Sequence, residues 1–136
     1  MPKIRVVIDT NLWISFLISK RINELRTLIL KKRIVVLFSN ELLREFLEVV
    51  NRPKFHKHFT SENIKGLLNA FDEFGIIVET TSLANKCRDK KDNFLLDLSI
   101  CGKAHYLITG DNDLLVIEKI NNTKILTFTE FIHLIK

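Results

Sequence analysis

Glycine, proline and cysteine are scarce in this chain of 136 residues, which has four glycines, two prolines and two cysteines. So few chain-breaking residues leave no obvious linker, and we expect one domain that spans residues 1–136. The two cysteines, Cys87 and Cys101, form no CxxC pair, and no histidine stands at zinc-finger spacing. We therefore expect reduced thiols and a cytoplasmic protein.

Long apolar runs are also missing, since none reaches the ~18–20 residues that a transmembrane helix needs. The acidic residue Asp9 comes too early for a secretory signal peptide. The net charge is +5, and it is unevenly spread: residues 1–59 hold 12 basic and 5 acidic side chains, whereas residues 60–136 hold 9 and 11. The basic front half is a weak indication of a polyanionic partner.

Short apolar runs rich in β-branched residues alternate with helical patterns along the chain. Because these runs are continuously apolar, they are typical of strands buried on both faces of a parallel sheet. The predicted strands are Ile4–Ile8, Ile34–Phe38, Ile76–Val78, Tyr106–Ile108 and Lys124–Leu126. The predicted helices are Leu12–Ile18, Ile22–Lys32, Asn40–Val50, Ser61–Phe74, Asp92–Ala104 and Thr129–Ile135. Gly75 is expected to cap the fourth helix. This order predicts an α/β fold with three layers, α/β/α, around a mostly parallel sheet.

Acidic residues follow two of the predicted strands. Asp9 comes directly after the first strand, and Asp111 and Asp113 come after the Tyr106–Ile108 strand. Ligands of parallel sheets bind beyond the carboxyl ends of the strands, at the point where the strand order reverses. If the first and fourth strands are neighbours, Asp9 and Asp111 meet at one crevice.

Two further acids lie on predicted helices. On the helical wheel of Asn40–Val50, Glu45 is the acid nearest the apolar edge, and Asp92 opens a later helix. Clustered carboxylates in a partly dry site either take up protons or bind a cation. Ligand sets made only of oxygen select hard ions such as Mg²⁺ or Mn²⁺, which polarise phosphoryl oxygens.

Each of these acids also has an ordinary explanation. Asp9 could simply cap the helix that follows it, and Asp92 would be favoured at a helix start by the helix dipole. Glu45 alone could be a solvated surface acid, and Asp111 and Asp113 could be turn residues. The combination of these acids favours a functional site.

The ordered set of motifs resembles that of PIN-domain ribonucleases over essentially the whole chain. The matching motifs are Ile8-Asp9-Thr10-Asn11 with Ser15, then Ser39 and Glu45, then Asp92, and finally Thr109-Gly110-Asp111. The stretches Cys87–Asp97 and Leu107–Leu115 are particularly similar to the toxin components of prokaryotic toxin–antitoxin pairs, the VapC-like toxins.

The resemblance implies a five-stranded sheet, cleavage of RNA phosphodiester bonds, a homodimer and inhibition by a small protein antitoxin. No membrane association is expected, because no apolar run is long enough to span one. The resemblance also implies that Mg²⁺ or Mn²⁺ is held by the catalytic acids Asp9, Glu45, Asp92 and Asp111, with Asp113 and Asp97 as second choices. Five polar side chains are expected to orient these carboxylates: Thr10, Asn11, Ser15, Ser39 and Thr109. Three lysines are expected to contact the RNA backbone: Lys54, Lys90 and Lys91.

Other functions remain open on the sequence alone. A PIN-fold module that binds RNA or a partner without cutting it would share this fold, and so would a DNA-directed PIN nuclease. A phosphotransferase of the haloacid dehalogenase type also begins with an acid after a strand. That chemistry wants an Asp-x-Asp motif, whereas Asp9-Thr10-Asn11 supplies one carboxylate.

Overall fold

A central six-stranded sheet organises the molecule. The computed structural model describes residues 3–19, 22–55, 57, 59–80 and 93–135. In this part of the chain the strand order is β3-β2-β1-β4-β6-β5. The strands are β1 (Ile4–Ile8), β2 (Ile34–Phe38), β3 (Gly75–Ile77), β4 (Tyr106–Ile108), β5 (Lys119–Ile120) and β6 (Thr123–Leu126). All neighbouring strands are parallel except β5 and β6, which confirms the predicted α/β fold with a mostly parallel sheet.

The expected number of five strands is wrong, because β5 adds a sixth. This strand has two residues and pairs with β6 in antiparallel fashion, so that Lys119 lies opposite Lys124. Two residues are too few to show a periodic pattern, and the sequence therefore gives no signal for β5.

The position of Gly75 is a second correction. Gly75 was expected to cap a helix, but it is the first residue of β3, and none of the described glycines has a positive φ. A Cβ atom at Gly75 would lie 2.3 Å from Phe38 Cε2 and 2.7 Å from the carbonyl oxygen of Phe71. Close packing, rather than a left-handed backbone, therefore explains this glycine.

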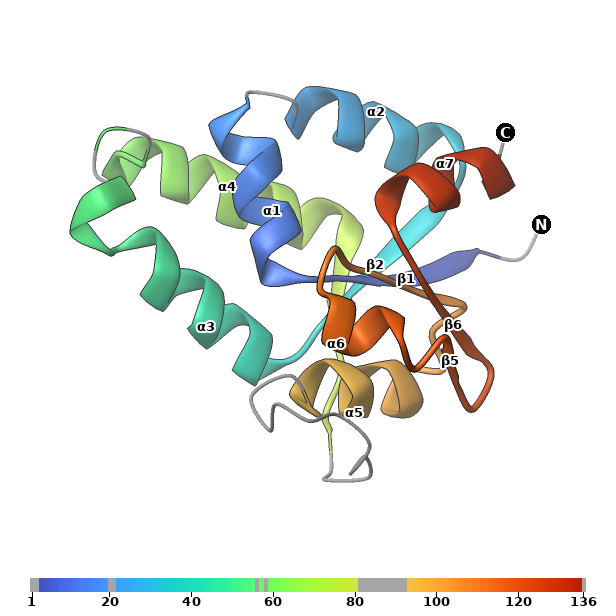
Figure 1. Ribbon diagram of the computed structural model, residues 1–136. Coiled ribbons are helices and arrows are strands. Elements are labelled where there is room, and N and C mark those ends of the chain that lie inside the picture. Colours follow the sequence, from blue (N-terminus) through green and yellow to red (C-terminus); the bar gives the residue numbers. More distant parts are fainter. Residues whose placement is uncertain (1–2, 20–21, 56, 58, 81–92, 136) are drawn as a thin grey trace.

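Helices cover both faces of the sheet. They are α1 (Thr10–Ile18), α2 (Ile22–Lys31), α3 (Asn40–Val50), α4 (Ser61–Phe74), α5 (Asn93–Cys101), α6 (Asn112–Leu115) and α7 (Phe128–Ile135), with a short 3₁₀ helix at Pro53–Phe55. Figure 1 shows α1, α2, α4 and α7 on one side of the sheet and α5 on the other. The helix α5 ends before the expected Ala104, because Lys103 adopts a left-handed φ of 51° that turns the chain into β4. Cys101 is half-buried at the end of α5, and Cys87 lies outside the described residues.

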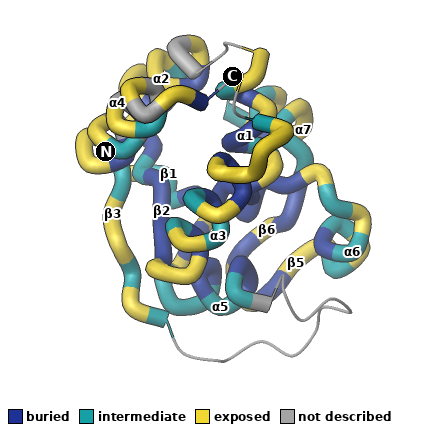
Figure 2. The backbone as a smooth tube through the Cα atoms, turned by 90° about the vertical axis from the view of Figure 1, so that its left-hand side faces the viewer, coloured by how far each residue is buried: buried dark blue, intermediate teal, exposed yellow. Residues whose placement is uncertain are grey.

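The core follows the strands and the inner faces of the helices, as the dark-blue stretches of Figure 2 show. An aromatic cluster joins α1, α3 and α4 to β2: Phe71 lies with its ring centre 4.9 Å from Trp13, 4.6 Å from Phe38 and 5.6 Å from Phe46. Such ring pairs contribute about 0.5–1.5 kcal/mol each beyond their buried area. The cluster fixes α1 and α3 against the sheet. Among the helices described, none is long and apolar enough to span a membrane.

Candidate active site

The strand order reverses between β1 and β4. From β1 the chain continues to β2 and β3 on one side, whereas β4 and β6 extend the sheet on the other. The first and fourth predicted strands are therefore neighbours, which is the condition under which Asp9 and Asp111 lie at one edge of the sheet. Asp9 follows β1 and donates its backbone N–H to the carbonyl oxygen of Ile108 at 3.0 Å. This is the place in a parallel sheet where ligands bind.

Asp9 is a buried carboxylate with both oxygens engaged. Asp9 is only 6% exposed. Oδ2 accepts a hydrogen bond from Thr109 Oγ1 at 2.7 Å, and Oδ1 accepts one from the backbone N–H of Asn11 at 3.3 Å. The second bond caps α1, so the capping role that the sequence left open is also present.

The environment of Asp9 favours its neutral form. Burial raises the pKa of the carboxyl group, and the negative charge of Asp111 adds to this rise, while the hydrogen bonds from Thr109 and Asn11 oppose it. A cation beside Asp9 would offset both the loss of hydration and the repulsion from Asp111. The carboxylate is therefore suited to a positively charged ligand.

Thr109 links Asp9 to the second acid of the site. This threonine is fully buried, and its hydroxyl accepts the backbone N–H of Asp111 at 3.0 Å while it donates to Asp9. Asp111 Oδ1 in turn accepts the backbone N–H of Asp113 at 2.9 Å and caps α6. One hydroxyl thus fixes the ends of two neighbouring strands relative to each other.

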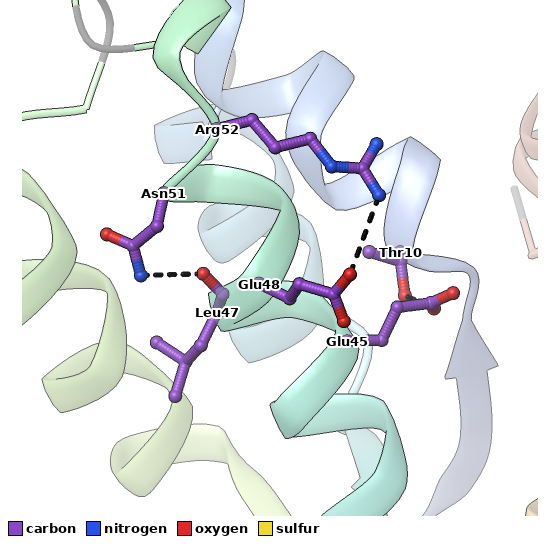
Figure 3. Close-up of polar contacts among 6 residues, drawn as sticks. All are labelled: Thr10, Glu45, Leu47, Glu48, Asn51 and Arg52. Carbon is purple, nitrogen blue, oxygen red and sulfur yellow. Dashed lines mark hydrogen bonds and ion pairs between the residues drawn. The ribbon is translucent and has the colours of Figure 1, made fainter.

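Thr10 connects the third acid, Glu45, to the end of β1. Its hydroxyl donates to Glu45 Oε2 at 2.6 Å, and Thr10 is 2% exposed. Figure 3 shows Glu45 pointing toward Thr10, whereas Glu48, on the same helix, points toward Arg52 with an N–O distance of 3.9 Å. Because Thr10 is the residue after Asp9, Glu45 is bonded to the neighbour of the buried carboxylate.

The remaining polar residues named from the sequence occupy different places. Ser39 is buried and caps α3, since its Oγ accepts the backbone N–H of Leu42 at 3.1 Å, and it thereby fixes the start of the helix that carries Glu45. Asn11 and Ser15 are exposed on α1, and Asn11 reaches Asp9 through its backbone. Asp97 is half-buried on α5.

Three of the predicted residues fall outside the described part of the chain: Lys90, Lys91 and Asp92. Lys54 is described and exposed, with its Nζ 5.1 Å from the ring centre of Phe55. Nothing in its surroundings tests a contact with RNA.

The described acids do not by themselves complete a metal site. Within residues 3–19, 22–55, 57, 59–80 and 93–135, no group of three or more His, Cys, Asp or Glu side chains could hold a metal ion. The chemistry of the donors nevertheless fits a hard cation, because Asp9, Glu45 and Asp111 offer only oxygen atoms and Asp9 is buried with a raised pKa. The residues present therefore suit Mg²⁺ or Mn²⁺ better than a thiol-seeking or imidazole-seeking metal.

The partners of the two threonines could not be foreseen. Thr10 and Thr109 were named as orienting residues, but their bonds to Glu45 and Asp9 join positions 35 and 100 residues apart. No spacing rule in the sequence relates such distant residues, and the fold alone brings them together.

Comparison with known proteins places these features in a family. Residues 5–113 match the PIN domain, a span that includes Asp9, Glu45 and Asp111. The chain is also 37% identical to the uncharacterized protein MJ1680 of Methanocaldococcus jannaschii, in an alignment of 141 residues that covers 96% of this chain and 90% of the relative. No solved structure matches the chain. PIN domains are generally nucleases that act on nucleic acid and typically use divalent metals. The chain belongs to the PIN domain family.

Proposed function

We propose that this protein is a ribonuclease that depends on a divalent cation and hydrolyses RNA phosphodiester bonds. The observation that supports it is the bonded arrangement of Asp9, Thr109 and Asp111 at the reversal of strand order, to which Thr10 adds Glu45. Membership of a nuclease family supports hydrolysis as the reaction. The choice of RNA over DNA rests on the resemblance of the motifs to PIN-domain ribonucleases.

The proposed ligands of Mg²⁺ or Mn²⁺ are Asp9, Glu45 and Asp111, together with Asp92, with Asp113 and Asp97 as second choices. When bound, such a cation polarises phosphoryl oxygens and lowers the pKa of water. Thr109 bonds the carboxylate of Asp9 and the backbone N–H of Asp111, and Thr10 bonds the carboxylate of Glu45. Because these groups are held in place before substrate arrives, little reorganisation is needed during the reaction.

The proposed contact with substrate uses three lysines. Lys54 is exposed next to the end of α3, the helix of Glu45, and we propose that it binds RNA phosphates together with Lys90 and Lys91. A point charge on a lysine suits phosphate without selecting a base sequence. This part of the proposal predicts binding of many RNA sequences with similar affinity.

Cleavage of labelled RNA tests the proposed reaction. The purified chain is incubated with structured RNA, unstructured RNA and single-stranded DNA in Mg²⁺, Mn²⁺ or EDTA. We expect cleavage of unstructured RNA that requires the cation and is lost in Asp9→Ala and in Asp92→Asn, whereas Glu48→Gln behaves as the wild type. Cleavage that survives Asp9→Ala and Asp92→Asn would show that the proposed site is wrong, and a preference for DNA would contradict the proposed substrate.

We further propose that the chain is a VapC-like toxin that works as a homodimer and is inhibited by a small antitoxin. The motif resemblance supports this role. Expression in a prokaryotic host is expected to arrest growth, and Asp9→Ala is expected to abolish the arrest. A small reading frame directly upstream would be the antitoxin, and its co-expression is expected to restore growth. Light scattering is expected to give twice the chain mass of 15.9 kDa. Normal growth on expression of the active wild type would exclude the toxin role.

A further inference from the structure

The amino ends of the parallel strands carry a group of cations on the opposite edge of the sheet from the acids. Five residues make up this group, which we call the amino-edge surface: Arg5, Lys103, His105, Lys119 and Lys124. Arg5 and Lys124 lie in β1 and β6, His105 directly precedes β4, and Lys119 begins β5. Among the described side chains, no carboxylate lies within ion-pair distance of Lys103, Lys119 or Lys124.

Two adjoining depressions run along this surface. One has a volume of about 610 Å³ and is lined in part by Arg5, Lys103 and His105. The other has a volume of about 540 Å³ and is lined in part by His105, Lys119 and Lys124. His105 and Asn122 line both, so the two depressions are neighbours and the cations border both of them.

Hydrogen bonds fix Arg5 and His105 in this region. Arg5 Nε donates to the carbonyl oxygen of Lys103 at 2.9 Å, and the backbone N–H of Arg5 donates to His105 Nδ1 at 3.0 Å. With Nδ1 as acceptor, the ring proton of neutral His105 is on Nε2, which is free to act as a donor. The guanidinium of Arg5 keeps four more N–H groups, which suits it to a phosphate oxygen pair.

The two lysines of the β5–β6 hairpin face each other. Lys119 and Lys124 are directly opposite in the antiparallel ladder, a position where like charges destabilise a sheet. Two acids lie close by. Glu118 lines the second depression, and the pKa of Glu130, which is lowered mainly by hydrogen bonds from Thr127, is lowered further by the charge of Lys124. The cations outnumber these acids, and a bound anion would relieve the repulsion between the two lysines.

Lys103 is not required by the turn that it forms. Its φ of 51° is a left-handed conformation that glycine adopts with less strain. The turn would form at least as readily with a residue that has no side chain. Lys103 is exposed and adds a positive charge beside Arg5, whose Nε bonds to its carbonyl oxygen.

We propose that the amino-edge surface is a second nucleic-acid site. It binds the phosphate backbone of RNA at the end of the sheet opposite to the acids of the proposed cleavage site. The choice of RNA rests on the proposed function. Protein interfaces usually have an apolar centre. The half-buried Ile100 and Tyr106 help to line the depressions, but the large exposed apolar side chains of the described chain lie outside them: Ile18, Leu30, Ile76, Ile77, Val116 and Leu134. Separate cations with N–H donors are instead typical of contacts to phosphates. Strand β1 has five residues, so about 17 Å of sheet separates the two edges.

Binding of a fluorescent, unstructured RNA tests this proposal. Anisotropy is measured in EDTA, where cleavage is suppressed, from about 50 to 200 mM salt. The variant Lys103→Gln/Lys119→Gln/Lys124→Gln is expected to bind more weakly, and the slope of log K against log salt is expected to fall by about 2, since each contact to single-stranded phosphate contributes about 0.7. Lys124→Gln is compared with Lys65→Gln, an exposed lysine on α4 that is expected to have no effect.

Cleavage measurements separate this proposal from the proposed function. The triple variant is expected to cleave a dinucleotide with unchanged kcat/KM and a long RNA more slowly than the wild type. If no RNA is cleaved by any form, the proposed function fails, but the binding assay still tests the second site. Wild-type affinity and salt slope in the triple variant would overturn the second site. So would binding of polyglutamate that depends on the three lysines while RNA binding does not.

Discussion

At the carboxyl ends of β1 and β4 buried hydroxyls bond to acids, whereas at the amino ends of the parallel strands the charged side chains are cations, most of them exposed. Asp9, Thr10 and Thr109 are each at most 6% exposed, and two hydroxyls tie them to the neighbouring acids. Lys119 and Lys124 are exposed, with no ion pair to any described residue. The carboxyl ends of the strands thus carry acids with buried, hydrogen-bonded partners, whereas the amino ends carry cations, of which the two lysines are exposed.

This difference matches two different physical tasks. A cation that takes part in a reaction needs ligands at fixed positions, and Thr109 and Thr10 provide that at the cost of burying Asp9. Holding a phosphate backbone needs positive charge but not one exact geometry, because the counterions that it releases supply most of the affinity. If the two edges divide these tasks, substitutions of the acids and of the lysines are expected to change different measured quantities.

The largest expected effect is a difference in kcat between substitutions of two glutamates on α3. Glu45→Gln is expected to lower kcat by about 10²–10³-fold, because it removes a charge that is held by Thr10. Glu48→Gln, which changes the exposed glutamate beside Arg52, is expected to leave kcat within about twofold, since exposed ion pairs contribute little. Single-turnover cleavage of RNA measures both. Equal losses in the two variants would contradict the assignment of Glu45.

A smaller effect is expected from removal of the Thr109 hydroxyl, which bonds Asp9 after β1 and the backbone N–H of Asp111 after β4. Thr109→Ala is expected to lower kcat by about 10–100-fold, because Asp9 and Asp111 lose their common partner. Thr109→Ser keeps the hydroxyl and is expected to retain most of the activity. Thr127→Ala serves as the comparison. Thr127 follows β6 at the same end of the sheet, but its hydroxyl accepts the backbone N–H of Glu130 at 3.2 Å and donates to the Glu130 side chain, so it caps α7 and bonds to none of the proposed acids. Its stability is expected to fall by about 1 kcal/mol without loss of kcat.

The charge of Asp9 is expected to cost stability when no cation is bound. Its pKa is raised by burial, so the folded state binds this proton more tightly than the unfolded state does. The resulting stability is present below the ordinary value of 3.8 and is lost as the pH rises through the higher folded value. In EDTA at neutral pH, Asp9→Asn is therefore expected to unfold at higher urea concentration than the wild type, and asparagine still caps α1.

The pH dependence checks the cause of that gain. The difference in free energy of unfolding between Asp9→Asn and the wild type is expected to shrink as the pH falls toward 3.8. A variant that is less stable than the wild type at neutral pH in EDTA would show that the Asp9 carboxylate stabilises the fold without a cation.

The smallest expected effect concerns the facing lysines of the amino edge. Lys119→Gln is expected to raise the free energy of unfolding by about 0.2–1 kcal/mol, because it removes a repulsion across the β5–β6 ladder. Urea denaturation measures this gain, which is expected to decrease in high salt. Lys65→Gln is expected to change stability by less. A loss of stability in Lys119→Gln would mean that its charge is already compensated within the chain.

Much of the fold could be predicted because its strands are continuous apolar runs. The bounds predicted for Ile4–Ile8, Ile34–Phe38 and Tyr106–Ile108 are those of β1, β2 and β4, and helices α3 and α4 also have their predicted bounds. The errors lie where the structure depends on distant contacts. The two-residue strand β5 exists because β6 lies beside it, and Gly75 belongs to β3 because it pairs with Val36 of β2.

In the candidate site, too, some features could be predicted from the sequence and others depend on distant contacts. Acids directly after strands were visible in the sequence, and the pairing of β1 with β4 brings Asp9 and Asp111 to one edge. The hydroxyl bridges were not visible, because each joins residues that only the fold makes neighbours. The rule for strand ends also applies at the other edge: Arg5, His105 and Lys124 all lie at or next to the beginnings of parallel strands, a signal that could have revealed the amino-edge surface.

Calorimetric titration of the protein with Mn²⁺ tests most directly whether the carboxyl-edge acids form a cation site. The wild type is expected to bind Mn²⁺, Asp9→Asn is expected to lose this binding, and the variant Lys103→Gln/Lys119→Gln/Lys124→Gln is expected to bind as the wild type does. Each protein is first shown to be folded by circular dichroism. Undiminished binding of Mn²⁺ to folded Asp9→Asn would contradict the central claim.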